Sequence, residues 1–236
     1  MASFESQIIS LTGISSNATN QGYMTSWLTN AARDVINSLP PQALINMGSI
    51  TEFGANLTAL ANVDRYIILG VSRVYNKKST TSQIGRFRAC RQISWSDIGI
   101  AESDSGYVQS YSVEDPVFYI YNNTLYVEPV SDSDYSAIVH HVAFPDVADE
   151  AENIADFPKG LEQAVTYRAA ADAARFLFQD EQDEDVYVPL IKDLTNQFAN
   201  SLKIYLSQFQ ATAPVQQEEV SSGASLQKMM KSLRGG

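Results

Sequence analysis

Apolar residues recur at helical spacing over the first 40 residues of the chain. The spacing predicts one helix over residues 3–11 and a second over residues 24–39, because each places its apolar side chains on one face. Pro40 and Pro41 end the second helix, since proline has no amide hydrogen to donate, and a short helical turn over 42–47 follows. The apolar stripes of the two helices consist of Phe4, Ile8, Leu11, Met24, Trp27, Leu28, Ala31, Val35 and Leu39.

The pattern changes to that of β-strands between about residues 50 and 145. Asn122 and Asn123 separate two of the apolar segments, and asparagine tolerates the positive φ of a tight hairpin turn. A Ser-capped helical turn is expected at Ser94–Ile98. The segments that predict strands are 66–71, 116–121, 124–129 and 136–144.

The second half of the chain returns to helical periodicity. Residues 161–178 are rich in alanine, which allows two helices to approach closely. The acidic run 180–185 is expected to be a loop, and the next apolar stripe continues to Phe209, which favours an antiparallel helical hairpin. The residues of that stripe are Tyr187, Ile191, Leu194, Phe198, Leu202, Tyr205 and Phe209.

Together these elements predict an α+β fold, a helical bundle with a long C-terminal helical hairpin and an inserted β-rich domain. The bundle combines residues 1–48 with residues 157–210. The insertion spans 49–156 and ends in an acidic connector. Residues 211–236 are interpreted as a linker and a C-terminal partner-docking tail.

The tail has a helical pattern of its own. Leu226, Met229, Met230 and Leu233 are spaced i, i+3, i+4 and i+7, and the cations Lys228, Lys231 and Arg234 fall on the other face. A segment this short does not hold a helix alone in water. It is therefore expected to fold into a groove on a partner; the alternative is a disordered tail whose periodicity is accidental.

Composition limits the classes of function. The chain has 236 residues, 44% of them hydrophobic, and a formal net charge of −11, which argues against coating a nucleic acid with the whole surface. No apolar run is long enough to span a bilayer, and no secretory signal or membrane partner is expected. With Cys90 as the only cysteine, an intrachain disulfide framework and a multi-cysteine zinc site are excluded.

Charge is distributed unevenly along the chain. Residues 72–96 contain six cations and no acid, whereas 146–156 and 180–185 each contain five acids and no cation. One interpretation is solvated loops that keep the protein soluble. Another is contact between copies, the cations of one copy meeting the acids of the next, and a third is that the cations face a DNA channel. These six cations are Arg73, Lys77, Lys78, Arg86, Arg88 and Arg91.

Residues for catalysis are sparse. The only histidines, His140 and His141, are adjacent on an expected strand and therefore point to opposite faces. Arg88 and Arg91 flank Cys90 and could lower its thiol pKa, although a small buried apolar role is favoured. No Gly-rich phosphate loop, nucleophile elbow or EF-hand spacing occurs. We therefore expect no catalytic residues, no metal, no cofactor and no enzymatic activity.

The order of elements, together with the stretch FPKGLEQAV at 157–165 before an Ala-rich helix and an acidic loop, resembles the head-to-tail adaptor proteins of tailed bacteriophages. These are also called connector, neck or tail tubular proteins. The resemblance implies a virion structural protein at the head–tail junction, assembled in the host cytoplasm into a homo-oligomeric ring, usually a dodecamer.

The resemblance also implies the partners of this ring. It docks under the portal protein, extends the channel through which genomic DNA passes without sequence-specific binding, and presents a surface to tail or nozzle proteins. The C-terminal segment reaches the portal in such families, a role that the tail residues named above match in position and pattern.

Two alternatives remain open at this point. One is another neck or tail component, such as a tail terminator or a minor capsid protein. The other is a non-viral regulatory or carbohydrate-binding module that uses the aromatic hairpin as its binding face. The aromatic residues of that hairpin are Phe118, Tyr119, Tyr121 and Tyr126.

Overall fold

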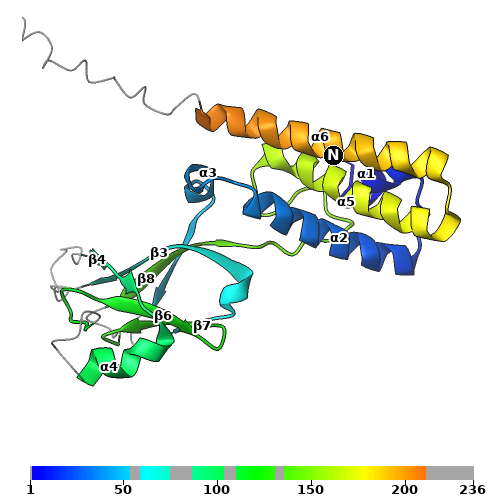
Figure 1. Ribbon diagram of the computed structural model, residues 1–236. Coiled ribbons are helices and arrows are strands. Elements are labelled where there is room, and N and C mark those ends of the chain that lie inside the picture. The colour runs from blue at the N-terminus through cyan, green and yellow to red at the C-terminus, as the bar shows by residue number, and fades with distance from the viewer. Residues whose placement is uncertain (1, 54–58, 75–86, 104–109, 131–135, 211–236) are drawn as a thin grey trace, which may run out of the picture.

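The structure is a computed structural model that describes residues 2–53, 59–74, 87–103, 110–130 and 136–210. Figure 1 shows a helical part and a β part, with α3 beside the passage between them. The helices are α1 (Phe4–Thr12), α2 (Ala18–Asn37), α3 (Pro41–Ile45), α4 (Ile98–Ser103), α5 (Lys159–Glu181) and α6 (Glu184–Gln210). The strands are β1 (Ser49–Phe53), β2 (Ala59–Ala61), β3 (Tyr66–Val74), β4 (Phe87–Ala89), β5 (Arg91–Gln92), β6 (Val117–Tyr121), β7 (Thr124–Glu128) and β8 (Ala137–Ala143).

Both helix and strand are therefore present, and the predicted α+β class is confirmed. The helical pattern located α1 well, but α2 begins six residues before the predicted start at residue 24. The Asn17 side chain accepts hydrogen bonds from the amides of Thr19 and Asn20 and so caps a polar first turn. This turn carries no apolar stripe, which is why periodicity alone does not find it.

The acidic run at 180–185 is not a loop, which corrects the sequence-based expectation. Helix α5 continues to Glu181 and α6 begins at Glu184, so only Gln182 and Asp183 lie outside the helices. Gln182 adopts φ 55°, the left-handed conformation that ends a helix in a short space. The Tyr187 hydroxyl donates a hydrogen bond to Glu181 Oε2 at 2.6 Å across this connection.

Two four-stranded sheets form the β part, in the orders β1-β8-β3-β4 and β2-β7-β6-β5. Asn122 and Asn123, with φ of 47° and 57°, close the β6–β7 hairpin, as the sequence predicts. The predicted Ser94 cap is only partly confirmed. A 3₁₀ turn at Trp95–Asp97 follows Ser94, but the Ser94 hydroxyl bonds Ser96 Oγ instead of capping the turn.

The two sheets face each other across a shared apolar core. Phe53, Val71 and Val139 come from one sheet, and Leu125 and Val127 from the other. A second and larger core lies between the helices, and it also takes in residues from the end of β8 and from the segment that follows this strand. The members from that region are Val142, Val147, Ile154 and Phe157.

The segment between β8 and α5 joins the two parts by backbone hydrogen bonds. The amides of Phe4 and Glu5 donate to the carbonyls of Ala151 and Asp149, at 2.9 and 2.8 Å. These amides belong to the first turn of α1 and have no partner within their own helix. The acidic connector is therefore ordered against the helical part.

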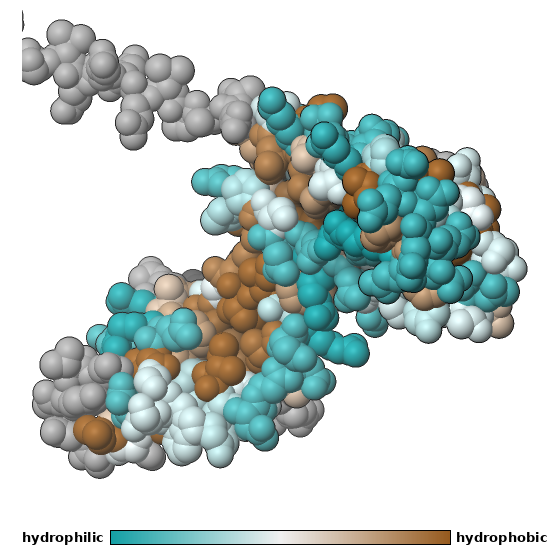
Figure 2. Space-filling view, turned by 45° about the vertical axis from the view of Figure 1, so that its right-hand side comes forward, coloured by the Kyte–Doolittle hydropathy of each residue, from teal (hydrophilic) through white to brown (hydrophobic). Residues whose placement is uncertain are grey.

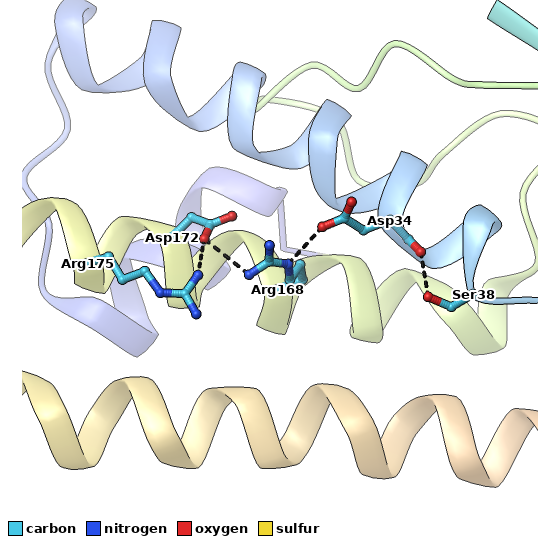
Figure 3. Close-up of polar contacts among 5 residues, drawn as sticks. All are labelled: Asp34, Ser38, Arg168, Asp172 and Arg175. Atoms are coloured by element: carbon cyan, nitrogen blue, oxygen red, sulfur yellow. Dashed lines mark hydrogen bonds and ion pairs between the residues drawn. The ribbon is translucent and has the colours of Figure 1, made fainter.

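Arg168 makes the main polar contact between α2 and α5. It lies between Asp34 of α2 and Asp172 of its own helix, and Arg175 also contacts Asp172 (Figure 3). The Ser38 hydroxyl donates to the Asp34 carbonyl one turn further along α2. These contacts set the rotation of α2 on the Ala-rich face of α5.

Candidate interaction surface

A groove lies where the helical part meets the β part. It is lined by residues 46–47, 153–159, Glu162 and Tyr205 and has a volume of about 610 Å³. We call it the junction groove. Its lining mixes the apolar side chains of Met47 and Phe157 with carboxylates and backbone groups, so the groove suits a ligand that is both apolar and polar.

The wall of the junction groove is held by local contacts. The Ile154 amide donates to Glu162 Oε1 at 3.0 Å, which fixes the loop to the first turns of α5. A methyl group at Gly160 would lie 3.4 Å from the Tyr205 ring, so the start of α5 passes close under α6. Burial raises the pKa of the Tyr205 hydroxyl.

A second hollow of about 240 Å³ continues the junction groove toward the end of β8. The two hollows share Met47, Ala155, Asp156 and Phe157, and the second adds Val142, Ala143, Pro145 and Asp146 to the lining. Asp146 and Asp156 line the combined surface, and both of these carboxylates are exposed.

The apolar stripe of α6 is unevenly covered. Tyr187 and Leu194 are buried in its N-terminal half, whereas Phe198, Leu202, Tyr205 and Phe209 are only partly buried. The stripe predicted as core packs on the helical core as far as Phe209, but it is more exposed in the C-terminal half of α6. Figure 1 shows that this end of α6 runs past the start of α5 on the side of α3.

Among the described residues, the three most exposed large apolar side chains lie on α6, α3 and β1. Ile204 of α6 is 67% exposed, Ile45 of α3 65% and Ile50 of β1 62%. Figure 2 shows hydrophobic side chains gathered in a band from beneath the end of α6 to the β part, on a surface that is otherwise largely hydrophilic. An apolar band on an acidic protein marks a surface that contacts another molecule.

No protein-family model matches this chain. No curated protein matches its sequence either. What the chain does is therefore inferred from its own residues and their arrangement.

The structure corrects the expectation for Arg73, the first of the six predicted contact cations. Arg73 is only 3% exposed and donates to the carbonyls of Val74 and Val130, at 3.2 and 3.1 Å. It stands two residues after the buried Val71 on β3 and so shares its inward side. It is not available to a neighbouring copy or to DNA.

The other five predicted contact cations differ in their exposure and in whether the structure describes them. Arg88 is exposed. Arg91 is half-buried and bonds Asp115 Oδ2 at 3.1 Å and the Ser110 carbonyl at 3.2 Å within the same chain. Lys77, Lys78 and Arg86 lie outside the described residues.

One acid of the connector is also unavailable for contacts between copies. Asp149 is 7% exposed and accepts a hydrogen bond from the Thr25 hydroxyl at 3.1 Å. The C-terminal tail residues Leu226, Met229, Met230 and Leu233 lie outside the described residues, as does the linker before them.

The two histidines lie on opposite faces of β8, as predicted. His141 is buried, with Nε2 2.8 Å from the Thr51 hydroxyl and its ring against that of Tyr66. Burial raises the pKa of the Cys90 thiol to about 12, although Arg73 acts in the opposite direction. The flanking arginines therefore do not activate this cysteine.

Within the part of the chain that the structure describes, no group of three His, Cys, Asp or Glu side chains is placed to hold a metal ion. In the same residues, no helix has both the length and the apolar character required to cross a bilayer.

Three of the four aromatic residues of the hairpin, Tyr119, Tyr121 and Tyr126, share one of its faces, and only Phe118 lies on the other. Phe118 is buried between the sheets, because side chains on β6 alternate between its two faces. The other rings pair with one another: Tyr119 stacks on Tyr126, and Tyr121 packs edge-on against Trp95. Rings paired in this way present less free face to a sugar.

The junction groove was not predicted from the sequence. Its lining residues come from three separate segments of the chain. One segment contains Phe157, Pro158, Lys159 and Glu162 of the stretch FPKGLEQAV, and another contributes Tyr205 of the α6 stripe. Nothing in the sequence indicates that these segments come together.

Proposed function

We propose that this chain is a virion structural protein, a head-to-tail adaptor that forms a ring beneath the portal of a tailed bacteriophage. In this proposal the ring extends the DNA channel and carries the surface to which the tail attaches. The observation that carries the proposal is the exposed apolar surface on α3, β1 and the end of α6 in a strongly acidic protein. Such a surface favours assembly with other copies or partners.

The arrangement of the elements also supports an assembly role. In the sequence, helices at both ends of the chain flank the β-rich insertion, and α5 packs against α6. Helix α6 ends at Gln210, so the tail begins at the margin of the helical part, next to the junction groove. A tail that leaves from this margin is able to reach a partner without unfolding the body.

Ring formation is tested with a matched pair of double variants on the full chain. Ile45→Asp with Ile204→Asp places two charges on the proposed contact surface. Val186→Asp with Val188→Asp places the same charges at the other end of α6, where both side chains are also exposed. Assembly on purified portal is followed by the mass of the complex.

The first double variant is expected to lose ring assembly at least tenfold, since desolvating a charge in an interface costs several kcal/mol. The second is expected to assemble like the unchanged chain. Equal assembly of both variants would contradict a ring contact through this surface. Failure of the unchanged chain to bind any portal would contradict the adaptor function itself.

The tail is proposed as the portal-docking segment. Deleting residues 223–236 is expected to leave the fold intact, because the described core ends at Phe209, and to abolish or strongly weaken attachment to DNA-filled heads. Lys228→Ala is the mild control and should matter little. Normal attachment of the truncated chain to heads would count against this role.

A further inference from the structure

We propose that, before assembly, the junction groove binds the C-terminal segment of its own chain, residues 226–234, through the apolar face of that segment. This goes beyond the adaptor function, because it assigns an intramolecular site to the same segment. The groove and the hollow that continues it have the mixed apolar and acidic lining that such a segment requires.

The described chain ends beside the groove. Tyr205 forms part of the wall, and α6 stops at Gln210, about 7 Å further along the helix axis. The 15 residues from 211 to 225 then separate α6 from Leu226. Fifteen residues span at most about 50 Å, so the groove lies within reach of Leu226.

The two surfaces are complementary in chemistry. The segment offers Leu226, Met229, Met230 and Leu233 on one face, and methionine adapts well to an irregular apolar surface. In the groove, Met47, Phe157 and the partly buried ring of Tyr205 provide the apolar side.

Charge is complementary as well. Lys228, Lys231 and Arg234 flank the apolar face of the segment. The groove and its extension carry Asp146, Asp156 and Glu162 against the single cation Lys159. Asp146 is 83% exposed at the rim, 4.0 Å from Arg65, so much of its surface remains open to a basic segment.

The tether makes the own-chain segment the favoured occupant. A short connection between two binding surfaces gives an effective concentration on the order of 1 mM. A dissociation constant of about 0.1 mM for the segment in the groove would then keep the docked form in about tenfold excess over the undocked form. A partner that binds the same apolar face must displace it, so the segment is covered until such a partner arrives.

The test is hydrogen–deuterium exchange by mass spectrometry on the full chain in isolation. The unchanged chain is compared with Met229→Asp and Met230→Asp combined, and with the control Ser221→Asp and Ser222→Asp, which adds the same charge in the linker. Neither change touches a described core residue.

Docking predicts about tenfold faster exchange at residues 153–159 and 203–210 in the Met229/Met230 variant, and no change in the control. The protection must also persist when the protein is diluted. Identical exchange in all three chains would overturn the proposal. Protection that disappears on dilution would overturn it too, because it would show docking on a second copy. Attachment to heads is not measured here, so this result and the adaptor function are judged separately.

Discussion

Arg168 Nε of α5 donates to Asp34 Oδ2 of α2 at 3.0 Å, joining residues 134 positions apart in the chain. The Arg168 side chain is 27% exposed and also bonds Asp172 Oδ1 at 3.2 Å. Both of its carboxylate partners hold the planar guanidinium in one orientation, which favours a stronger contact than an isolated surface pair.

Breaking this ion pair should lower the free energy of unfolding. We expect Arg168→Ala to cost about 1 kcal/mol, and a double-mutant cycle with Asp34→Ala to give a coupling energy of about 0.5–1 kcal/mol. Urea unfolding measures both values. Arg175→Ala, which removes a contact within α5 alone, should cost less. A coupling energy of zero would show that the pair does not hold α2 to α5.

Shortening a buried side chain of α6 should lower the stability of the protein more than shortening an exposed one. Leu194 is 1% exposed, so Leu194→Ala should destabilise by about 2–5 kcal/mol through lost burial and a residual cavity. Ile204 is 67% exposed, and Ile204→Ala should change stability by less than about 0.5 kcal/mol. Thermal unfolding compares the two variants. Similar losses at both positions would mean that the end of α6 is covered in the isolated chain.

The alanines of α5 should be intolerant of larger side chains. Ala170 is fully buried between α5 and α6, so Ala170→Leu should push the helices apart and cost about 1–3 kcal/mol. Ala199→Leu adds the same volume on an exposed position of α6 and serves as the control. Denaturant unfolding measures the free energy of unfolding of both variants. An unchanged free energy of unfolding in Ala170→Leu would show that the helices do not approach closely there.

Stability should depend on pH through His141. Burial lowers the pKa of His141 below its ordinary value of 6.5, and the neighbouring His140 lowers it further. The unfolded chain therefore takes up this proton more readily, and the free energy of unfolding should fall as the pH drops through about 6.5. The His141→Gln variant should lack this component when its urea midpoints are followed from neutral to mildly acidic pH.

The matched control for that titration is His140→Gln. His140 lies on the opposite face of β8, at the position paired with Ile50, so its replacement should leave most of the pH dependence in place. If His141→Gln and the unchanged chain lost stability in parallel, the carboxylates alone would account for the acid sensitivity.

Cys90 should react slowly with thiol reagents. Its pKa is raised from 9.0 to about 12 by burial, so the thiolate is about a thousandfold scarcer than in the unfolded chain at the same pH. Labelling rates in native buffer and in urea test this. Fast labelling of the native chain would indicate that β4 and β5 open readily around the residue.

Local spacing in the sequence was sufficient for the types of element. A helical stripe is a property of one segment, as at Ile8 or Leu28, and the hairpin at Asn122 and Asn123 requires only that these residues tolerate positive φ. The ends of elements were less well predicted where a polar cap set them, as at Asn17, or where a helix continued through acids, as at Glu181.

The sequence by itself therefore determined the α+β class, the order of the long helices and of strands β3, β6, β7 and β8, and the opposite faces of His140 and His141, because periodicity and turn chemistry act over a few residues. The short strands β1, β2, β4 and β5 were not predicted. Only the tertiary structure decided that Arg73 and Asp149 are buried, that the end of α6 is left partly uncovered, and that Met47, Phe157 and Tyr205 line one groove. Which residues are buried and which line a groove depends on how distant segments pack together. A local sequence pattern does not contain that information.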